Sequence, residues 1–180
     1  MKNSKNKTQR ILTTAQIKAI VDRFAIEISK QYGSLDSVAF IGIRTRGPYI
    51  AKRLAETIKK QYGKEIPIGE MDITLYRDDL NALLPGGTVD HTSIPFDIAN
   101  KIVVLFDDVL NTGRTVRAAV DHLIDLGRPR MIHLAVMIDR GGRELPIAAN
   151  YVGKKIALPK GGNVRVRLKE VDKTDEVVIG

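Results

Sequence analysis

Cysteine is absent from the 180-residue chain, which excludes disulfide bonds and thiolate metal sites. Long apolar runs are absent as well, so no segment has the length and composition of a membrane span. The basic, polar start, MKNSKNKTQR, lacks the apolar stretch of a secretory signal peptide. Internal repeats and low-complexity blocks are not found either. These absences predict a soluble protein, with the cytoplasm as the expected compartment and no membrane partner.

Acidic residues are outnumbered, because 21 Asp and Glu stand against 29 Lys and Arg and give a formal net charge of +8. This excess favours anionic partners such as phosphorylated metabolites or nucleic acid. The length suits one compact domain with a sizeable core and is too short for two ordinary ones. We expect a flexible basic tail over residues 1–12 and a single domain over residues 13–180.

From Thr13 onward, short apolar runs alternate with amphipathic segments. Apolar residues between Ile17 and Ile28 recur at helical spacing, and Thr13 and Gln16 are placed for a capping box. Strands are predicted at residues 38–43, 66–76, 101–106 and 131–138, helices near 13–33, 44–63 and 115–127, and a half-exposed edge strand at 164–171. Apolar strands that alternate with helices predict an α/β fold with a mostly parallel central sheet flanked by helices.

Three polar turns follow predicted strands, namely RTRG after residue 43, DDVLNTGRT after residue 106 and DRGG after residue 138. In an open parallel sheet, ligands bind outside the carboxyl ends of the strands. Each turn by itself is also compatible with an ordinary solvated connection. Their occurrence after three strands of the same predicted sheet indicates a common ligand site.

The central turn has the features of a phosphate cradle. Gly113 can adopt a positive φ and admit a ligand close to the backbone, and the TGRTV segment opens a helix whose first amide groups are unpaired. Thr112 and Thr115 add hydroxyl donors. Arg114 adds positive charge, or else points into solvent. The turn is neither a Walker loop nor a G-x-G-x-x-G loop.

Asp107 and Asp108 stand shortly before this cradle. They would repel the phosphate that the loop attracts, so we expect them to serve another part of the same ligand. Paired carboxylates accept hydrogen bonds from the vicinal hydroxyls of a ribose, which favours a sugar phosphate. Direct Mg²⁺ ligation is the alternative, because Mg²⁺ takes one or two carboxylates together with phosphate oxygens. The histidines His91, His122 and His133 show no ligand spacing.

The stretch VVLFDDVLNTGRTV resembles the signature of type I phosphoribosyltransferases, in which two acidic residues and a T-G-x-T loop bind phosphoribosyl diphosphate. Further stretches, IGIRTRG, GEMDITLYRDDL, DLGRP, DRGGRELPI and YVGKKI, resemble the pyrimidine-operon attenuation regulators with uracil phosphoribosyltransferase activity. The similarity runs from about Ile17 to Val171. It implies the type I phosphoribosyltransferase fold with a small hood and a flexible loop. It also implies a reaction in which uracil and phosphoribosyl diphosphate give UMP and diphosphate with Mg²⁺.

The resemblance further implies site residues. Arg77, Asp107 and Asp108 would be catalytic, and Mg²⁺ would be carried by phosphoribosyl diphosphate without a direct protein ligand. Arg46, with backbone groups of the flanking residues, would hold the diphosphate. The residues implied to bind phosphoribosyl diphosphate are Thr45, Arg46, Gly47, Arg77, Asp107, Asp108, Val109, Leu110, Asn111, Thr112, Gly113, Arg114 and Thr115. Arg77 would reach the diphosphate when a hood loop over about residues 76–95 closes, and the alternative is a disordered surface loop.

Base recognition is implied for the MIDRG segment. Ile138 would pack on the ring, and backbone groups near Asp139 and Arg140 would read its edge. Asp139 has the alternative role of capping its own turn. Purine-using relatives carry an acidic residue at the position of Asn111, where it can take a proton from the purine, so Asn111 favours a pyrimidine. Members of the present family often have tyrosine there, which makes Asn111 a departure as well.

The second implied activity is binding of pyrimidine-operon leader mRNA, assisted by UMP, through a basic face of a homodimer or higher homo-oligomer. Candidate RNA-binding residues are Lys18, Arg23, Arg143, Lys154, Lys155 and Arg167. Asp22, Ile26 and Gly142 replace the threonine and the two histidines that RNA-binding members carry. We therefore predict that catalysis is retained and that RNA binding is weakened or lost. The alternatives are an RNA-binding or UMP-sensing regulator with little catalysis, and phosphoribosyl transfer to another base.

Overall fold

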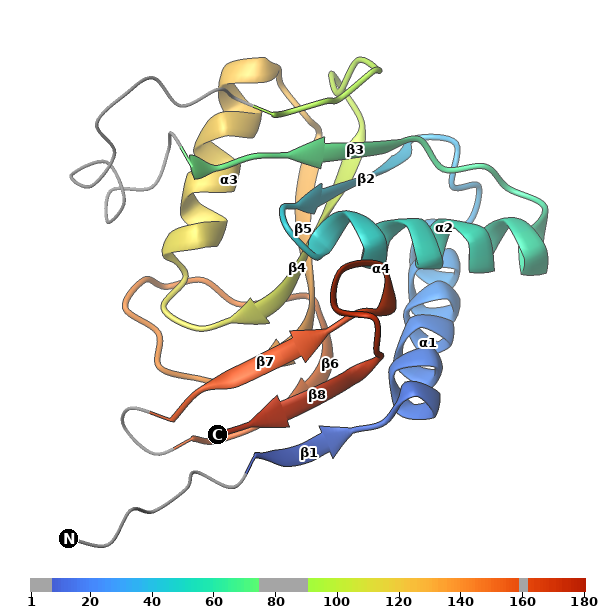
Figure 1. Ribbon diagram of the computed structural model, residues 1–180. Coiled ribbons are helices and arrows are strands. Elements are labelled where there is room, and N and C mark those ends of the chain that lie inside the picture. The colour runs from blue at the N-terminus through green and yellow to red at the C-terminus, as the bar shows by residue number, and fades with distance from the viewer. Residues whose placement is uncertain (1–7, 75–90, 159–161) are drawn as a thin grey trace, which may run out of the picture.

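The computed structural model describes residues 8–74, 91–158 and 162–180. Its elements form two sheets and a set of flanking helices (Figure 1). In chain order the elements are β1 (Gln9–Leu12), α1 (Thr14–Tyr32), β2 (Val38–Ile43), α2 (Gly47–Tyr62), β3 (Ile68–Met71), β4 (Ile102–Leu110), α3 (Arg114–Leu126), β5 (Met131–Asp139), β6 (Tyr151–Lys155), β7 (Val164–Arg167), α4 (Lys169–Asp172) and β8 (Glu176–Ile179). Arg77 and the rest of the predicted hood loop up to residue 90 lie outside the described residues.

The larger sheet has five parallel strands in the order β3-β2-β4-β5-β6. Helices α1 and α2 pack on one face, and α3 covers the other (Figure 1). This arrangement confirms the predicted α/β fold with its mostly parallel central sheet. Among the described helices, none combines the length and the apolarity needed to cross a bilayer.

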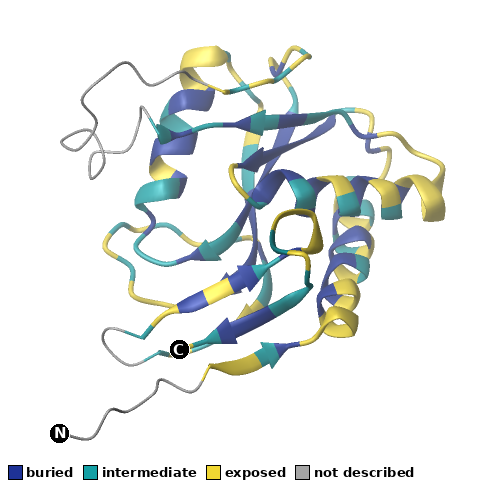
Figure 2. Ribbon diagram, viewed as in Figure 1, coloured by how far each residue is buried: buried dark blue, intermediate teal, exposed yellow. Residues whose placement is uncertain are grey.

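The core lies on both faces of the sheet, and β2 is buried along its whole length (Figure 2). On the side of α1 and α2, the rings of Phe40 and Phe106 meet edge to face with centroids 4.9 Å apart. Helix α1 begins with the predicted capping box of Thr13 and Gln16 and ends at Gly33. Each fully buried large apolar side chain contributes about 1.5–3 kcal/mol to this core.

The smaller sheet is antiparallel, in the order β1-β8-β7. Its strand β1 corrects the prediction of a flexible tail over residues 1–12, because residues 9–12 pair with β8 and Leu12 is only 4% exposed. Strands β6 and β8 were not predicted from the sequence. Residues 164–167 form the predicted edge strand, but at the edge of this second sheet. The smaller sheet therefore joins the first and last described segments of the chain.

Strand β4 is longer than predicted. The segment from Asp107 to Leu110 was expected in a turn, yet it continues the ladder with β5, where Asp107 lies opposite Val136 and Leu110 opposite Asp139. The turn that precedes α3 is accordingly confined to residues 111–113. The two carboxylates are thus fixed on a strand rather than on a loop. Glu70 of β3 forms an antiparallel bridge with Ser93, which lies near the end of the predicted hood segment.

Candidate functional site

The three predicted turns meet at one edge of the larger sheet. Strands β2, β4 and β5 are parallel neighbours, so their carboxyl ends point the same way. Gly42 pairs with Phe106 across β2 and β4, and Leu110 pairs with Asp139 across β4 and β5. The structure therefore brings the segments after residues 43, 110 and 139 together, as the sequence predicted.

The turn between β2 and α2 is built on two close backbone approaches. A Cβ atom added to Gly42 would lie 2.1 Å from the backbone nitrogen of Pro48, and one added to Gly47 would lie 2.2 Å from the carbonyl oxygen of Phe106. Only glycine fits at either position. The backbone of Gly47 therefore lies directly against β4 at Phe106. The peptide bond between Arg44 and Thr45 is cis.

Arg46 stands at the start of α2 and is about one quarter exposed. Its Nε and Nη2 atoms donate to the two carboxylate oxygens of Asp172, at 3.0 and 2.7 Å. Its Nη1 atom lies 4.0 Å from Oδ2 of Asp108. Hydrogen bonding to the Asp172 carboxylate, with Arg46 as the donor, is the main reason that the pKa of Arg46 is raised. Arg46 is thus oriented by a residue that the sequence reasoning missed.

Asp107 and Asp108 have different surroundings although they are neighbours on β4. Asp107 is only 6% exposed, and its Oδ1 accepts a hydrogen bond of 2.8 Å from the amide of Asp108. The side chain of Asp108 is 27% exposed and faces Arg46. Burial raises the pKa of the Asp108 carboxyl, and the Arg46 guanidinium opposes that shift. A hydrogen bond involving the Asp107 side chain also lowers the pKa of Asp108, so the two carboxylates lie close together.

A cavity of about 460 Å³ lies over Asp108 and Arg46. Its other walls are Asp172 and the residues of β7, so the smaller sheet forms one side of the site. Along β4, residues 102–107 and Leu110 are buried, whereas Asp108 and Val109 are partly exposed (Figure 2). The cavity therefore combines three arginines, Arg46, Arg165 and Arg167, with the carboxylates of Asp108 and Asp172.

The turn before α3 has the geometry expected of a phosphate cradle. Gly113 has φ +96° and caps α3, so it occupies the left-handed region that glycine favours. The Thr112 hydroxyl accepts a hydrogen bond from the amide of Arg114 at 3.3 Å. The Nε atom of Arg114 donates to Glu144 at 2.7 Å across an exposed ion pair. This pairing fits the alternative in which Arg114 points outward.

The loop after β5 is held by its own side chains. Asp139 accepts hydrogen bonds from the amide of Gly141 at 3.0 Å and from Arg143 at 2.7 Å. Burial alone would raise the pKa of Asp139, but these hydrogen bonds lower it overall. The geometry therefore favours the capping role of Asp139. Arg140 donates to the carbonyl oxygen of Gly162 at 2.6 Å.

The packing of Ile138 on the base ring stays a prediction, and the structure shows where its side chain lies. Ile138 is 0% exposed and lies in the core cluster on the side of α1 and α2. It shares this core cluster with Val164 and Val166, which also line the cavity. Strand pairing explains the burial, because Val109 on β4 and Lys154 on β6 flank Ile138.

Arg143, a candidate RNA-binding residue, is hydrogen-bonded within the chain. Its Nη1 atom donates to the carbonyl oxygen of Asn111 at 2.8 Å, and its Nε atom donates to that of Ile147 at 2.9 Å. Asn111 lies close to Gly142, where an added Cβ would be 2.9 Å from Oδ1 of Asn111. Arg143 therefore ties the loop after β5 to the turn before α3.

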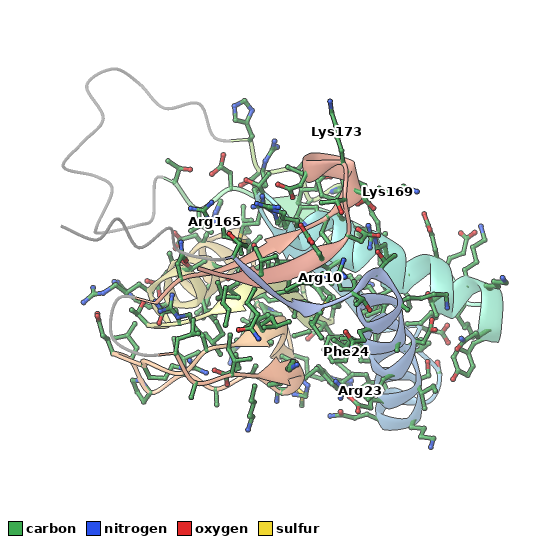
Figure 3. All side chains as sticks on the ribbon, turned by 60° about the horizontal axis from the view of Figure 1, so that its bottom comes forward. Arg10, Arg23, Phe24, Arg165, Lys169 and Lys173 are labelled. Atoms are coloured by element: carbon green, nitrogen blue, oxygen red, sulfur yellow. The ribbon has the colours of Figure 1, made fainter. Side chains whose placement is uncertain are left out.

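The other predicted RNA-binding cations are mostly engaged within the chain. Lys18 pairs with Asp22 at 2.6 Å, and Lys154 donates to the carbonyl oxygen of Ile11 at 3.1 Å. Arg23 donates to two carbonyl oxygens of β6 and lies over the ring of Phe24, 5.2 Å from its centroid (Figure 3). Arg167 pairs with Glu176 at 2.9 Å. Helix α1 carries Lys18 and Arg23, strand β6 carries Lys154 and Lys155, and Arg23 links the two elements.

The histidines do not form a metal centre. His133 bonds through Nδ1 to the hydroxyl of Tyr32, and burial lowers its pKa. His122 is buried on α3. Over the described ranges, no group of three or more His, Cys, Asp or Glu side chains is arranged to hold a metal ion.

Comparisons with known proteins place the chain among described relatives. It matches the phosphoribosyl transferase domain family over residues 7–170. The bifunctional protein PyrR of Chloroflexus aurantiacus is 52% identical over 171 residues, which cover 95% of this chain and 94% of that protein. The bifunctional protein PyrR of Elusimicrobium minutum is 49% identical over 164 residues, covering 91% and 92%.

A solved structure of a hypoxanthine phosphoribosyltransferase from Staphylococcus aureus is also similar. It has a TM-score of 0.70 and 22% sequence identity, and the match covers 94% of this chain and 90% of that one. At this identity the likeness concerns the fold alone, and it leaves the base open.

Proposed function

The chain belongs to the phosphoribosyltransferase family and, within it, to the bifunctional PyrR proteins, and on this premise we propose that it transfers the phosphoribosyl group of phosphoribosyl diphosphate to uracil. The products are UMP and diphosphate. The observation that carries the proposal is the arrangement at the end of β4. Asp108 faces the Arg46 guanidinium at 4.0 Å, and Gly113 opens α3 five residues later with φ +96°.

The chemical task is mostly electrostatic. Positive charge develops at the anomeric carbon of the ribose as diphosphate departs, and negative charge collects on the leaving group. The first amides of α3 and the hydroxyls of Thr112 and Thr115 hold the 5-phosphate. Arg46 and the backbone of Thr45 and Gly47 hold the diphosphate. These contacts keep the two ends of the substrate apart and align the bond that breaks.

Asp107 and Asp108 address the ribose between the two phosphate sites. Asp108, exposed to the cavity, accepts from the ribose hydroxyls and stabilises the positive charge that develops beside it. Asp107 is nearly buried and holds the amide of Asp108, so it orients its neighbour. Val109, Leu110 and Asn111 connect these carboxylates to the cradle. Arg77 and its loop complete the diphosphate site in this proposal.

The carboxylates fit a Mg²⁺ ion that is bound mainly by substrate oxygens. Mg²⁺ takes one or two carboxylates plus phosphate oxygens, and the described residues offer Asp107 and Asp108 but no larger cluster. Burial disfavours the ionised form of Asp108, which a nearby divalent cation would offset. Mg²⁺ bound there would neutralise the departing diphosphate. The two aspartates would hold the ribose hydroxyls, directly or through water bound to this Mg²⁺.

A pyrimidine base is supported by Asn111. The carboxamide of Asn111 cannot take a proton from a purine ring, in contrast to the acidic residue of purine-using relatives. Asn111 is also held beside Gly142 by the bond from Arg143 to its carbonyl oxygen. Backbone groups near Asp139 and Arg140 read the edge of the base in this proposal.

Competition between bases tests the proposed substrate. Purified protein is supplied with phosphoribosyl diphosphate, Mg²⁺ and equal concentrations of uracil, hypoxanthine and guanine, and the nucleotides are separated and quantified. We expect UMP as the dominant product. Formation of a purine nucleotide in place of UMP would show that the base assignment is wrong.

A second function, binding of a pyrimidine-operon leader mRNA, is supported by the name of the relatives, which are called bifunctional. Its contacts would involve the side of α1 and β6 that carries Lys18, Arg23, Lys154 and Lys155. Asp22 pairs with Lys18 at 2.6 Å and thereby weakens the positive field of α1. We expect weak binding, measured as UMP-dependent, salt-sensitive retention of the leader hairpin. Retention equal to that of a scrambled RNA would rule this function out.

A further inference from the structure

The segment that joins β7 to β8 presents carboxylates to helix α2. Asp172 meets Arg46, while Glu170 and Asp175 meet Arg53. Arg46 and Arg53 are seven residues apart, which is close to two helical turns, so their side chains leave the same face of α2. Lys173 of the same segment is exposed and points away from the protein (Figure 3). The segment therefore turns its acidic side toward α2.

Asp172 binds only one edge of the Arg46 guanidinium, so the other edge is available to a ligand. Nε and Nη2 of Arg46 form a two-pronged contact with the carboxylate of Asp172. The Nη1 atom is left on the side of Asp108 and of the 460 Å³ cavity. Asp172 itself is fixed, because its Oδ2 also accepts from the amide of Leu168 at 2.9 Å. Planar, two-pronged pairing of this kind restricts the orientation of an arginine.

The pair of Arg53 and its carboxylates holds the segment in place without involving Arg46. Arg53 donates to both oxygens of Glu170 at 2.9 and 2.6 Å, and to Asp175 at 2.7 Å. Asp175 also accepts from the amide of Lys169 at 2.9 Å. Arg53 thus docks the segment between β7 and β8 on α2. Arg46 connects the same segment to the cavity. Asp172 lies on this docked segment and also binds Arg46 at the cavity.

We propose that Asp172 is a positioning residue, which holds the Arg46 guanidinium so that its Nη1 edge faces the diphosphate of the bound substrate. The inference rests on the proposed function, because it takes Arg46 as a ligand of diphosphate. An arginine that is already oriented loses less conformational freedom when the substrate binds. In this role Asp172 acts through Arg46, to which both of its carboxylate oxygens are hydrogen-bonded.

The variant Asp172→Asn tests this role. It keeps the size of the side chain and removes the charge that fixes the guanidinium. We expect the KM for phosphoribosyl diphosphate to rise about three- to tenfold, as for the loss of one preorganised side chain. The kcat and the KM for uracil should change less than twofold. Thermal unfolding of each variant shows whether the fold is retained.

Glu170→Gln is the matched control. It lies on the same short helix, neutralises a carboxylate that also holds an arginine of α2, and does not contact Arg46. We expect it to lower the unfolding temperature while leaving the KM for phosphoribosyl diphosphate unchanged. An equal rise of KM in both variants would overturn the inference, because it would reflect docking of the smaller sheet alone.

A double-mutant cycle with Arg46→Ala separates an effect through Arg46 from any other. If Asp172 acts through Arg46, Asp172→Asn changes the KM in the native background but not in the Arg46→Ala background. A similar change in both backgrounds overturns the inference. An unchanged KM overturns it as well, and so does a lowered KM, which would mean that Asp172 competes with diphosphate for Arg46.

Calorimetry without any base keeps this test separate from the proposed function. Titration with phosphoribosyl diphosphate and with inorganic diphosphate should give a weaker Kd for Asp172→Asn by the same factor as the KM. If the native protein binds phosphoribosyl diphosphate but does not use uracil, the base assignment fails while the Kd still decides the role of Asp172. A native protein that binds neither compound overturns both.

Discussion

Gly47 is the position where a single added methyl group should disturb the site most. A Cβ atom there would lie 2.2 Å from the carbonyl oxygen of Phe106 and 3.1 Å from the carbonyl carbon of Gly42. Ordinary contact begins near 3.4 Å, so Gly47→Ala must force the backbones of α2 and β4 apart by about 1 Å. Phe106 immediately precedes Asp107 and Asp108 on β4, so the displacement reaches both carboxylates.

The expected effects of Gly47→Ala follow from that displacement. Misplacement of catalytic groups by about 1 Å can cost about a hundredfold in rate, and we expect kcat/KM for phosphoribosyl diphosphate to fall by that order. Overpacking of this kind costs about 1–3 kcal/mol of stability. For a chain of this size, each kcal/mol lowers the Tm by about 2–4 °C. Initial rates of diphosphate release and thermal unfolding measure the two effects.

Gly63→Ala is the matched control, because it strains the backbone away from the site. Gly63 caps the end of α2 with φ +67°, and an added Cβ would meet no atom within 4 Å. A non-glycine residue in this region costs about 1–2 kcal/mol, so its Tm should fall to a similar extent. Its kcat/KM should stay at the native value. Native kinetics for Gly47→Ala, or an equal loss in both variants, would refute the reasoning.

Three further predictions concern charges. Asp108→Asn should lower kcat about a hundredfold while leaving the Tm unchanged or raised, because burial raises the pKa of Asp108 and disfavours its ionised form in the folded state; a Tm that falls with activity contradicts this. The hydrogen bond from Arg53 lowers the pKa of Glu170, so the stability that this pair contributes is present above about pH 4 and is lost as the pH falls through the lowered pKa. The Tm difference between the native protein and Glu170→Gln should therefore shrink between pH 7 and pH 3, and a constant difference would argue against the pairing. Arg143→Ala should destabilise the protein by about 1–3 kcal/mol, since it leaves the carbonyl groups of Asn111 and Ile147 unpaired. If Arg143→Ala instead weakens RNA retention without lowering stability, Arg143 acts as a contact to RNA.

The sequence allowed most of the larger sheet and its helices to be predicted. Strands β2, β4 and β5 are continuous apolar runs, and α1 to α3 have apolar residues at helical spacing with recognisable caps. The left-handed turn at Gly113 was also predicted, because a glycine before a helix has few other reasons to be there. These features depend on residues that are close in the sequence, and local pattern is therefore sufficient.

The smaller sheet and its contacts could not be predicted in the same way. Strands β1 and β8 have four residues each, and they pair across almost the whole length of the chain. Asp172 lies 126 residues from Arg46, and no local pattern connects an acidic residue after β7 to the start of α2. The interior position of Arg143 depends on how the loop after β5 folds back on residues 111 and 112. Ile138 is buried because β6, which was not predicted, covers the outer side of β5.

The most direct test of the central claim is the stoichiometry of the products. The purified protein is incubated with uracil, phosphoribosyl diphosphate and Mg²⁺, and UMP and diphosphate are quantified over time. The account predicts equal amounts of both products at every time point, with formation of both slowed about a hundredfold by Asp108→Asn. Diphosphate released without UMP, or UMP formation unaffected by Asp108→Asn, would contradict the claim that this site transfers the phosphoribosyl group to uracil.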